Sequence, residues 1–165
     1  MGSSGARPGM KLAGLAILAC HWAGLALADA RCTPGRVDLR WDGGRESFIV
    51  EVADEPVERS RGLKQRDRMD LQAGMLFVYE KPTRARFWMK DTLIPLDLIF
   101  ADATGLVTRV HANAVPLDVT SIDGGTGVRF VLEINGGLAA KLGITAGAQL
   151  RHPAIGAAAV WPCAG

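Results

Sequence analysis

The sequence predicts an α+β fold, a β-rich single domain of mainly antiparallel short strands with two short helices. Short apolar runs alternate with turn residues along most of the chain, as they do in β-rich domains. Two segments carry the residues that start or stop helices. The 137 residues that follow residue 28 are enough for one domain around one core. The pattern leaves open whether the sheet closes into a barrel.

The first 28 residues resemble a secretory signal peptide. Arg7 and Lys11 are their only charges, and they precede an apolar run that ends in the small-x-small sequence Ala26-Leu27-Ala28. An uncleaved membrane anchor and a lipidated Cys20 are the alternatives. We therefore expect a periplasmic or secreted protein with no membrane attachment after cleavage.

The chain without this leader is electrically balanced. The full sequence has 19 basic and 17 acidic side chains, and the loss of Arg7 and Lys11 leaves 17 of each. Binding of nucleic acid requires a basic patch or stripe, and no run of lysine or arginine supports one. We therefore expect no nucleic-acid partner.

Two cysteines, Cys32 and Cys163, remain near the two ends after cleavage. In an exported protein they are expected to form one disulfide, with two free thiols as the alternative. His111 and His152 are isolated and have no partner at ligand spacing. We therefore predict no metal and no cofactor.

Alternating or continuous apolar residues predict the strands. We expect an extended leader and a first strand within residues 29–45, the β-rich domain over residues 46–152, and a tail over residues 153–165. Within the domain the predicted strands are 48–52, 74–80, 86–90, 96–101, 106–111, 129–135 and 148–151.

The two helices are predicted from their ends. Asp54-Glu55-Pro56 combines acidic residues near the cap with a proline in the first turn, so a helix should begin there and run to about Arg66. A second helix should span residues 138–142, because Gly143 is placed to end it in a left-handed conformation.

Four segments occur in an order that is typical of one family: RGL at 61–63, GMLFVYE at 74–80, FWMKDTLIPLDLIF at 87–100 and FVLEINGG at 130–137. On these motifs the chain resembles the family of domain of unknown function 192 over residues 48–152. The resemblance implies a compact β-rich α+β domain that is often exported, and it implies no established activity. The family usually has Asn at Asp91 and Met at Lys64.

Charged residues interrupt the most apolar segment, residues 87–100. A charge removed from water is costly unless it is paired, so these residues should pair or face a cleft. Strand alternation and the first helix suggest one polar cluster beside an indole. The candidate binding residues are Arg61, Trp88, Lys90, Asp97, Glu133 and Asn135.

Three functions suit such a cluster, and a buried polar network without a ligand is the structural alternative. The first is an exported binding or accessory module of the cell envelope, with a small, partly anionic ligand held by Lys90 and Arg61. The second is a hydrolase of an envelope polymer such as a carbohydrate, with Asp97 and Glu133 as catalytic carboxylates. The third is a protein–protein adaptor. We expect a monomer whose partner is a small molecule or an envelope protein.

Overall fold

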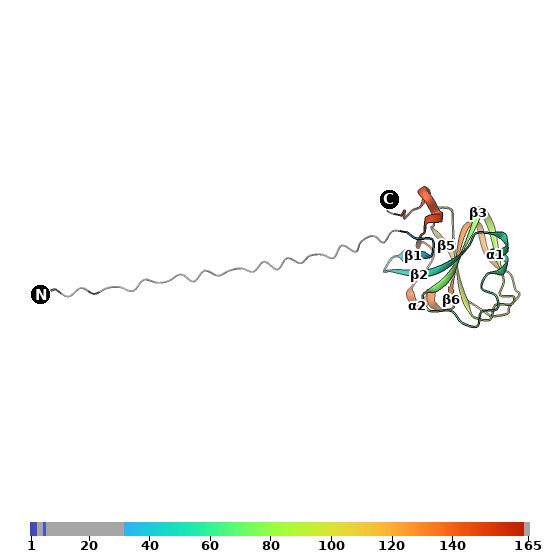
Figure 1. The fold of residues 1–165 in the computed structure, drawn as a ribbon, viewed down its shortest axis with the longest axis horizontal. Coiled ribbons are helices and arrows are strands. Elements are labelled where there is room, and N and C mark those ends of the chain that lie inside the picture. Colours follow the sequence, from blue (N-terminus) through green and yellow to red (C-terminus); the bar gives the residue numbers. More distant parts are fainter. Residues whose placement is uncertain (3–4, 6–31, 164–165) are drawn as a thin grey trace.

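The computed structural model describes residues 1–2, 5 and 32–163 (Figure 1). Apart from residues 1–2 and 5, the predicted signal peptide, including its apolar run and Cys20, falls outside the described residues. Within the described ranges, no helix is long and apolar enough to cross a membrane.

Seven strands form one sheet, accompanied by two short α-helices and one 3-10 helix. The order of the strands across the sheet is β5-β4-β6-β3-β2-β1-β7. The elements are β1 (Arg36–Trp41), β2 (Gly44–Ala53), α1 (Pro56–Arg61), β3 (Ala73–Phe87), β4 (Leu96–Ala101), β5 (Val107–Ala114), β6 (Ile122–Asn135), α2 (Leu138–Leu142), β7 (Gln149–Arg151) and the 3-10 helix η1 (Pro153–Ala158).

The prediction of mainly antiparallel short strands is confirmed in part: most pairings are antiparallel, but the sheet is mixed and two of its strands are long. β2 and β3 pair in parallel, and the other five pairings are antiparallel. A parallel pair requires a crossover connection, and α1 with the loop of residues 62–72 supplies it. β3 and β6 have 15 and 14 residues and are bulged after Val78, so these two strands are long.

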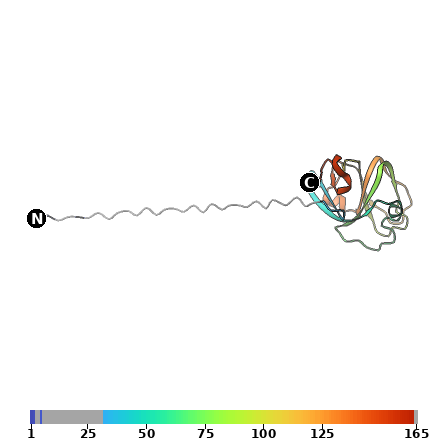
Figure 2. The same ribbon diagram turned by 45° about the horizontal axis from the view of Figure 1, so that its top comes forward.

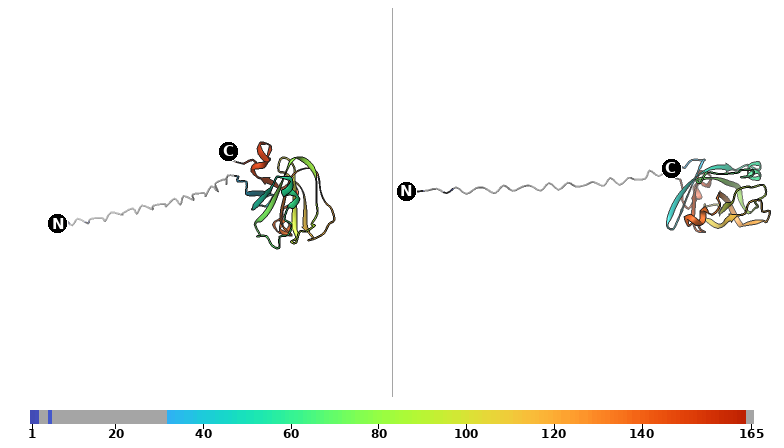
Figure 3. Two further views of the ribbon diagram at one scale, coloured as in Figure 1. Left: turned by 45° about the vertical axis from the view of Figure 1, so that its right-hand side comes forward. Right: turned by 90° about the horizontal axis from the view of Figure 1, so that it is seen from below.

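The sheet curls into a half-barrel whose two end strands approach each other (Figures 2 and 3). Leu106, just before β5, forms an isolated backbone bridge with Gln149 of β7. The N–H of Leu150 donates to the carbonyl of Gly105 at 2.8 Å. The curl brings β5 and β7 together although they lie at opposite ends of the strand order.

The two faces of the sheet bury separate hydrophobic clusters. The α2 cluster contains Ala139 of α2 together with Leu132 of β6. The loop cluster contains Val131 of β6 and Leu63, which comes from the loop after α1. Side chains along a strand alternate between faces. Glu133 therefore lies on the same face as Val131, the face of the loop cluster.

α1 begins at the predicted position but is shorter than predicted. The carboxylate of Glu58 accepts a hydrogen bond from the N–H of Glu55 at 3.2 Å, and the two residues form a capping box. Gly62 has a φ of 53° and ends the helix well before Arg66. The bounds of α2 are those predicted, and Gly143 ends it with a φ of 82°.

The two ends of the domain are fixed to each other. The predicted disulfide between Cys32 and Cys163 is confirmed, with an S–S distance of 2.07 Å. Trp161 is buried, and the guanidinium of Arg151 lies 4.4 Å from the centroid of its ring. Arg151 also donates to the carboxylate of Asp38 in β1 at 2.7 Å. The segment that contains Trp161 is therefore packed against the sheet, within the described residues.

Candidate functional site

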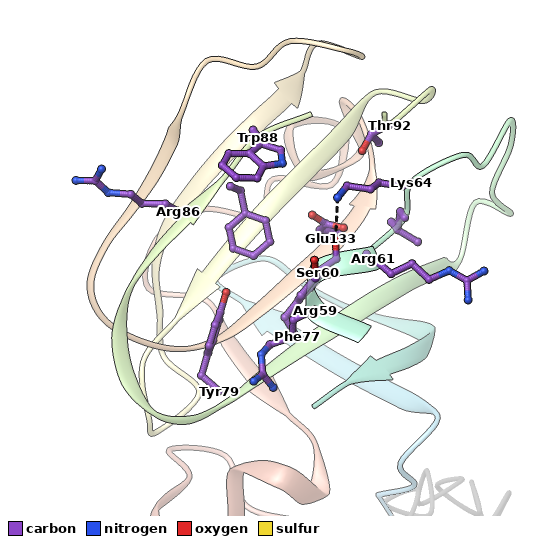
Figure 4. Close-up of a pocket in the computed structure, with 13 residues that line it drawn as sticks. Arg59, Ser60, Arg61, Lys64, Phe77, Tyr79, Arg86, Trp88, Thr92 and Glu133 are labelled. Atoms are coloured by element: carbon purple, nitrogen blue, oxygen red, sulfur yellow. Dashed lines mark hydrogen bonds between the residues drawn. The ribbon is translucent and has the colours of Figure 1, made fainter. Parts of the chain in front are cut away.

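A pocket of about 270 Å³ opens on the face of the loop cluster (Figure 4). It lies between α1, the loop that follows α1, the strands β3 and β6, and the loop that follows β3. Its lining combines aromatic rings, cationic side chains and a single buried carboxyl group. Drug-sized ligands occupy pockets of roughly 300–1,000 Å³, so this pocket suits a smaller molecule.

Glu133 supplies the buried carboxyl group. It is 5% exposed, and its ladder neighbours are the apolar residues Met75 of β3 and Leu98 of β4. No other described residue forms a hydrogen bond or an ion pair with its carboxyl oxygens, and burial alone raises the pKa of Glu133 to about 8. At neutral pH this group is mainly a neutral carboxylic acid that is open to the pocket.

Lys64 supplies the cation that is directed into the pocket, as Figure 4 shows. Its ammonium donates one hydrogen bond to the carbonyl oxygen of Ser60 at 2.8 Å. The guanidinium groups of Arg61 and Arg86 point outward in the same view. Together with Arg59, the pocket lining therefore has one inward ammonium and three guanidinium groups, of which those of Arg61 and Arg86 point outward.

Arg59 and Tyr79 form the side of the pocket next to α1. The Arg59 guanidinium lies 5.4 Å from the centroid of the Tyr79 ring, and it donates to the carbonyl of Val78 at 3.0 Å. Burial raises the pKa of Tyr79, so its hydroxyl stays protonated at neutral pH. The phenol is thus available as a hydrogen-bond donor.

Aromatic rings make a second wall, which begins at Phe77 beside Gly62, the residue that ends α1. Phe77 and Phe87 meet edge to face with their centroids 5.1 Å apart, and Phe87 packs in the same manner on Phe100 at 5.8 Å. Trp88 extends this wall and remains 56% exposed. The rings are held by the core on one side and present apolar surface to the pocket on the other.

Two loops that are tied to each other hold these side chains in place. The N–H of Gln65 in the first loop donates to the carbonyl of Asp91 in the second at 2.8 Å. Both residues have a positive φ, 62° for Gln65 and 61° for Asp91, and Asp and Asn adopt this conformation more readily than most residues. Leu63 and Thr92 are buried and anchor the two loops. These contacts fix the position of the two loops that line the pocket.

Asp97 lies away from this pocket. In the ladder between β4 and β6 it pairs with Ile134, while Leu98 pairs with Glu133, so Asp97 points to the other face of the sheet. Its carboxylate accepts three backbone N–H groups, those of Asn113 at 2.6 Å, Gly137 at 2.8 Å and Ala139 at 2.6 Å. Asp97 therefore holds the start of α2, and it does not share a face of the sheet with Glu133 as the strand alternation predicted.

Lys90 and Asn135 also lie outside the pocket. β3 ends at Phe87, so Lys90 occupies an exposed turn and not the expected strand position. The amide of Asn135 donates to the backbone carbonyl of Asp70 at 2.9 Å. Of the six candidate residues, the structure brings together Arg61, Trp88 and Glu133.

Sequence reasoning missed several residues of the pocket. Phe77 and Tyr79 share the face of Met75, which pairs with Glu133 in the ladder between β3 and β6, so a known register would have found them. Lys64 is harder to identify as a pocket residue from the sequence. It follows Gly62, the glycine that ends α1 and turns the chain across the pocket.

Other pockets on the described surface are less suited to binding a ligand. A second one, of about 240 Å³, lies beside His111 and Asp118, which are only half-buried or exposed. Nowhere in the described part of the chain do three His, Cys, Asp or Glu side chains gather in a way that could hold a metal ion. The pocket at Glu133 is the candidate functional site.

Two solved structures resemble this chain in sequence and fold. A protein of unknown function from Novosphingobium aromaticivorans has 41% identity and a TM-score of 0.68, and the match covers 70% of this chain and 82% of the other. A protein from Sinorhizobium meliloti, described as a candidate transcription regulator, has 34% identity and a TM-score of 0.71, with 75% and 97% covered. No protein with curated function matches the sequence significantly.

The sequence also matches a family model over residues 37–152. This family is DUF192, described as "Uncharacterized ACR". The match includes the whole of the pocket, all seven strands except the first residue of β1, and both α-helices. The chain therefore belongs to the family of domain of unknown function 192, as its motifs predicted.

Proposed function

We propose that the protein is a binding module whose pocket at Glu133 takes a small, partly anionic molecule. One observation carries this proposal: the buried carboxyl of Glu133 has no partner among the described residues and faces a pocket with an inward ammonium. A buried polar group without a partner costs about 1–3 kcal/mol. A ligand that hydrogen-bonds to Glu133 would offset that cost.

Lys64 would bind the anionic group of the ligand, the role that the sequence analysis predicted for Lys90. Its ammonium has two N–H donors beyond the one that it gives to Ser60, and these suit a carboxylate or phosphate. Arg61 and Arg86 at the rim add a field that attracts anions. The aromatic wall would cover the apolar part of the ligand.

A purely structural network fits the site less well. In such a network the charged members pair with one another, as Asp38 does with Arg151 at the far end of the sheet. Lys64 instead donates to a backbone carbonyl, and Glu133 forms no ion pair with it or with any other described residue.

The hydrolase alternative loses its second carboxylate, because Asp97 lies on the other face and holds three backbone N–H groups. Glycosidases of the usual kind need two carboxyl groups that flank one bond. The geometry at Glu133 supports binding more directly than it supports hydrolysis.

An adaptor is the second candidate function, and one surface favours it. The loops of residues 88–95 and 115–121 are joined by a hydrogen bond from the N–H of Met89 to the carbonyl of Asp118 at 2.8 Å. Together these loops expose five large apolar side chains, those of Trp88, Leu93, Val115, Leu117 and Val119. Clustered apolar side chains of this kind often mark an interface.

We place the protein in the periplasm or outside the cell. The leader of residues 1–28 has the composition of an export signal, and disulfides persist in oxidising compartments. The neutral charge balance of residues 29–165 does not favour transfer of the description as a transcription regulator to this chain.

A thermal-shift screen tests the proposal. The purified protein would be melted with amino acids, hydroxy acids, sugar acids, sugar phosphates and nucleotides, since a ligand of the native state raises the melting temperature. We expect a class of compounds that stabilises the wild type and the Lys90→Ala control but not Glu133→Gln or Lys64→Met. A screen in which every compound acts equally on all four proteins would exclude the pocket as the binding site.

A further inference from the structure

We infer that the ligand of this pocket is a small zwitterion of the amino-acid class, whose ammonium meets Glu133 and whose carboxylate meets Lys64. This inference rests on the proposed binding function and adds the chemical class of the ligand. It starts from two side chains of opposite charge type that share one small pocket and do not touch.

The carboxyl of Glu133 is open to the pocket. Met75 and Leu98 flank it in the sheet and offer no polar atom. In the pocket its two carboxyl oxygens can accept hydrogen bonds. An ammonium group has three N–H donors and no acceptor. It is therefore a better match for an unpartnered carboxyl at a pocket base than a second acidic group would be.

Lys64 offers the opposite chemistry at the pocket mouth. One hydrogen bond to Ser60 fixes its ammonium, and no carboxylate of a described residue lies within ion-pair distance of it. A ligand carboxylate would complete its hydrogen bonds, and the outward guanidinium of Arg61 would add to the favourable potential.

The space between these two groups is short and lined by rings. Phe87 and Trp88 line this space, and Tyr79 lies next to α1 against Arg59. Aromatic faces attract cations and cover apolar side chains, so they suit both the ammonium and the side chain of an amino acid. The pocket volume of about 270 Å³ limits the ligand to one such unit.

Binding of an ammonium has a measurable consequence for protons. Glu133 is mainly protonated before binding at neutral pH. The ammonium favours its ionised form, so the carboxyl proton leaves for solvent while the ligand keeps its own proton. The other titratable groups that line the pocket are Arg59, Arg61 and Lys64 from α1 and its loop and Tyr79 and Arg86 from β3. Burial raises the pKa of Tyr79, so its hydroxyl is not a source of the released proton.

A hydroxy acid would behave differently at the same site. Neutral Glu133 could donate its proton in a hydrogen bond to the ligand hydroxyl, and no proton would be released. Proton release therefore separates an amine ligand from a hydroxyl ligand even when the two bind with similar affinity.

Isothermal titration calorimetry with matched compounds tests the inference. The probes are alanine and phenylalanine, each with its 2-hydroxy acid and with the amine that lacks the carboxylate. Titrations at pH 7 in phosphate and in Tris would report proton release from the difference in buffer ionisation heat. We expect an amino acid to bind with release of up to one proton, and both partial analogues to bind roughly tenfold more weakly or worse.

Two variants assign the contacts. Glu133→Gln should abolish the proton release and the preference for the amine, and Lys64→Met should abolish the preference for the carboxylate. Lys90→Ala should bind like the wild type. The melting curve of each variant would show whether it folds. If a variant does not fold, the proton release measured for the wild type still tests the inference.

Each other outcome overturns the inference. If a hydroxy acid binds as tightly as its amino acid without proton release, the pocket binds anions and only the proposed function stands. If none of these compounds binds but a sugar acid or phosphate from the broader screen does, the class is wrong. If nothing in either experiment binds at the pocket, the proposed function falls with it.

Discussion

Glu133 lies directly opposite Leu98 in the ladder between β4 and β6, so it faces the pocket while Asp97, one residue before Leu98, faces α2. The two acids differ accordingly. Asp97 is buried and accepts three backbone N–H groups, whereas the carboxyl of Glu133 has no partner among the described residues. One acid fixes the fold and the other is free for a ligand.

Replacement of Asp97 should destabilise the domain. Hydrogen bonds to a charged group contribute about 1.5–3 kcal/mol each, and Asp97→Ala removes the acceptor of one buried N–H, that of Ala139, and of two partly buried ones. We expect a loss of at least about 3 kcal/mol in the free energy of unfolding, measured by urea denaturation. Asp70→Ala, an exposed control, should change it by less than about 0.5 kcal/mol. Equal effects of the two variants would contradict this role for Asp97.

Glu133 should make stability fall as pH rises. Its pKa is about 8 in the folded protein against an ordinary value of 4.5, so the folded state holds a proton that the unfolded state has lost within this window. The stabilising effect of this proton is complete below about pH 4.5 and is lost as the pH rises through about 8, with a slope of at most about 1.4 kcal/mol per pH unit.

The variant Glu133→Gln isolates this effect. The difference in unfolding free energy between wild type and Glu133→Gln should turn against the wild type from about pH 5 to pH 8, because other titrating groups such as His152 cancel in the difference. Urea titrations across this range would measure it. A difference that stays constant with pH would show that Glu133 is ionised in the folded state.

The ion pair of Asp38 and Arg151, which lies at the end of the sheet far from the pocket, should stabilise the domain. Both side chains are buried, with 5% and 2% exposed, and their atoms lie 2.7 Å apart. Removal of one partner from such a pair typically costs about 3–5 kcal/mol. Arg151→Ala should therefore lower the unfolding free energy by that amount. Arg36→Ala, which removes the more exposed partner of Asp38, should cost clearly less.

Loss of the disulfide should destabilise the domain without affecting the pocket. Cys32 and Cys163 are 131 residues apart, and closing a loop of this length contributes roughly 4–5 kcal/mol in the chain-entropy description. The double variant Cys32→Ser/Cys163→Ser should melt at a lower temperature. Its affinity for a ligand of the pocket, measured well below that temperature, should match the wild type.

Replacement of Trp88 should affect ligand binding, whereas replacement of Trp161 should affect stability. Trp88 is 56% exposed beside the pocket, whereas Trp161 is 6% exposed in the C-terminal segment, where its ring packs against Arg151. Trp88→Ala should weaken ligand binding roughly tenfold with little loss of stability. Trp161→Ala should cost about 3–5 kcal/mol of stability and leave affinity intact. Calorimetry and urea denaturation of both variants would measure this, and a large loss of stability in Trp88→Ala would argue for a packing role.

Alternation in the sequence was enough to predict most strands and the face of Glu133. It located residues 74–80, 96–101 and 129–135 in strands, and the helix signals located both helices. It could not predict register, and a shift of one residue moves a side chain to the other face. That is why Asp97 was placed with Glu133 although the ladder sets it opposite Ile134.

Lys90 shows a second limit of pattern reading. The alternation of Phe87, Trp88, Met89 and Lys90 predicts a continued strand, but β3 ends at Phe87. The N–H of Met89 bonds instead to the carbonyl of Asp118, and Asp91 turns with a φ of 61°. These contacts join segments that are far apart in the sequence, so no local pattern reveals them. The hydrogen bond between Gln65 and Asp91 ties this loop to the loop after α1, and the two loops bring Trp88 and Lys64 to one pocket.

The bond between Cys32 and Cys163 gives the domain the topology of a closed ring. A protease that cuts one exposed loop, such as residues 115–121, would produce two chains that remain covalently joined and packed in one sheet. Such a cut would appear only after reduction, as two bands in place of one on a gel. We place the protein in the periplasm or outside the cell, where it would meet proteases. Because of this linkage, a single cut would not release any part of the fold.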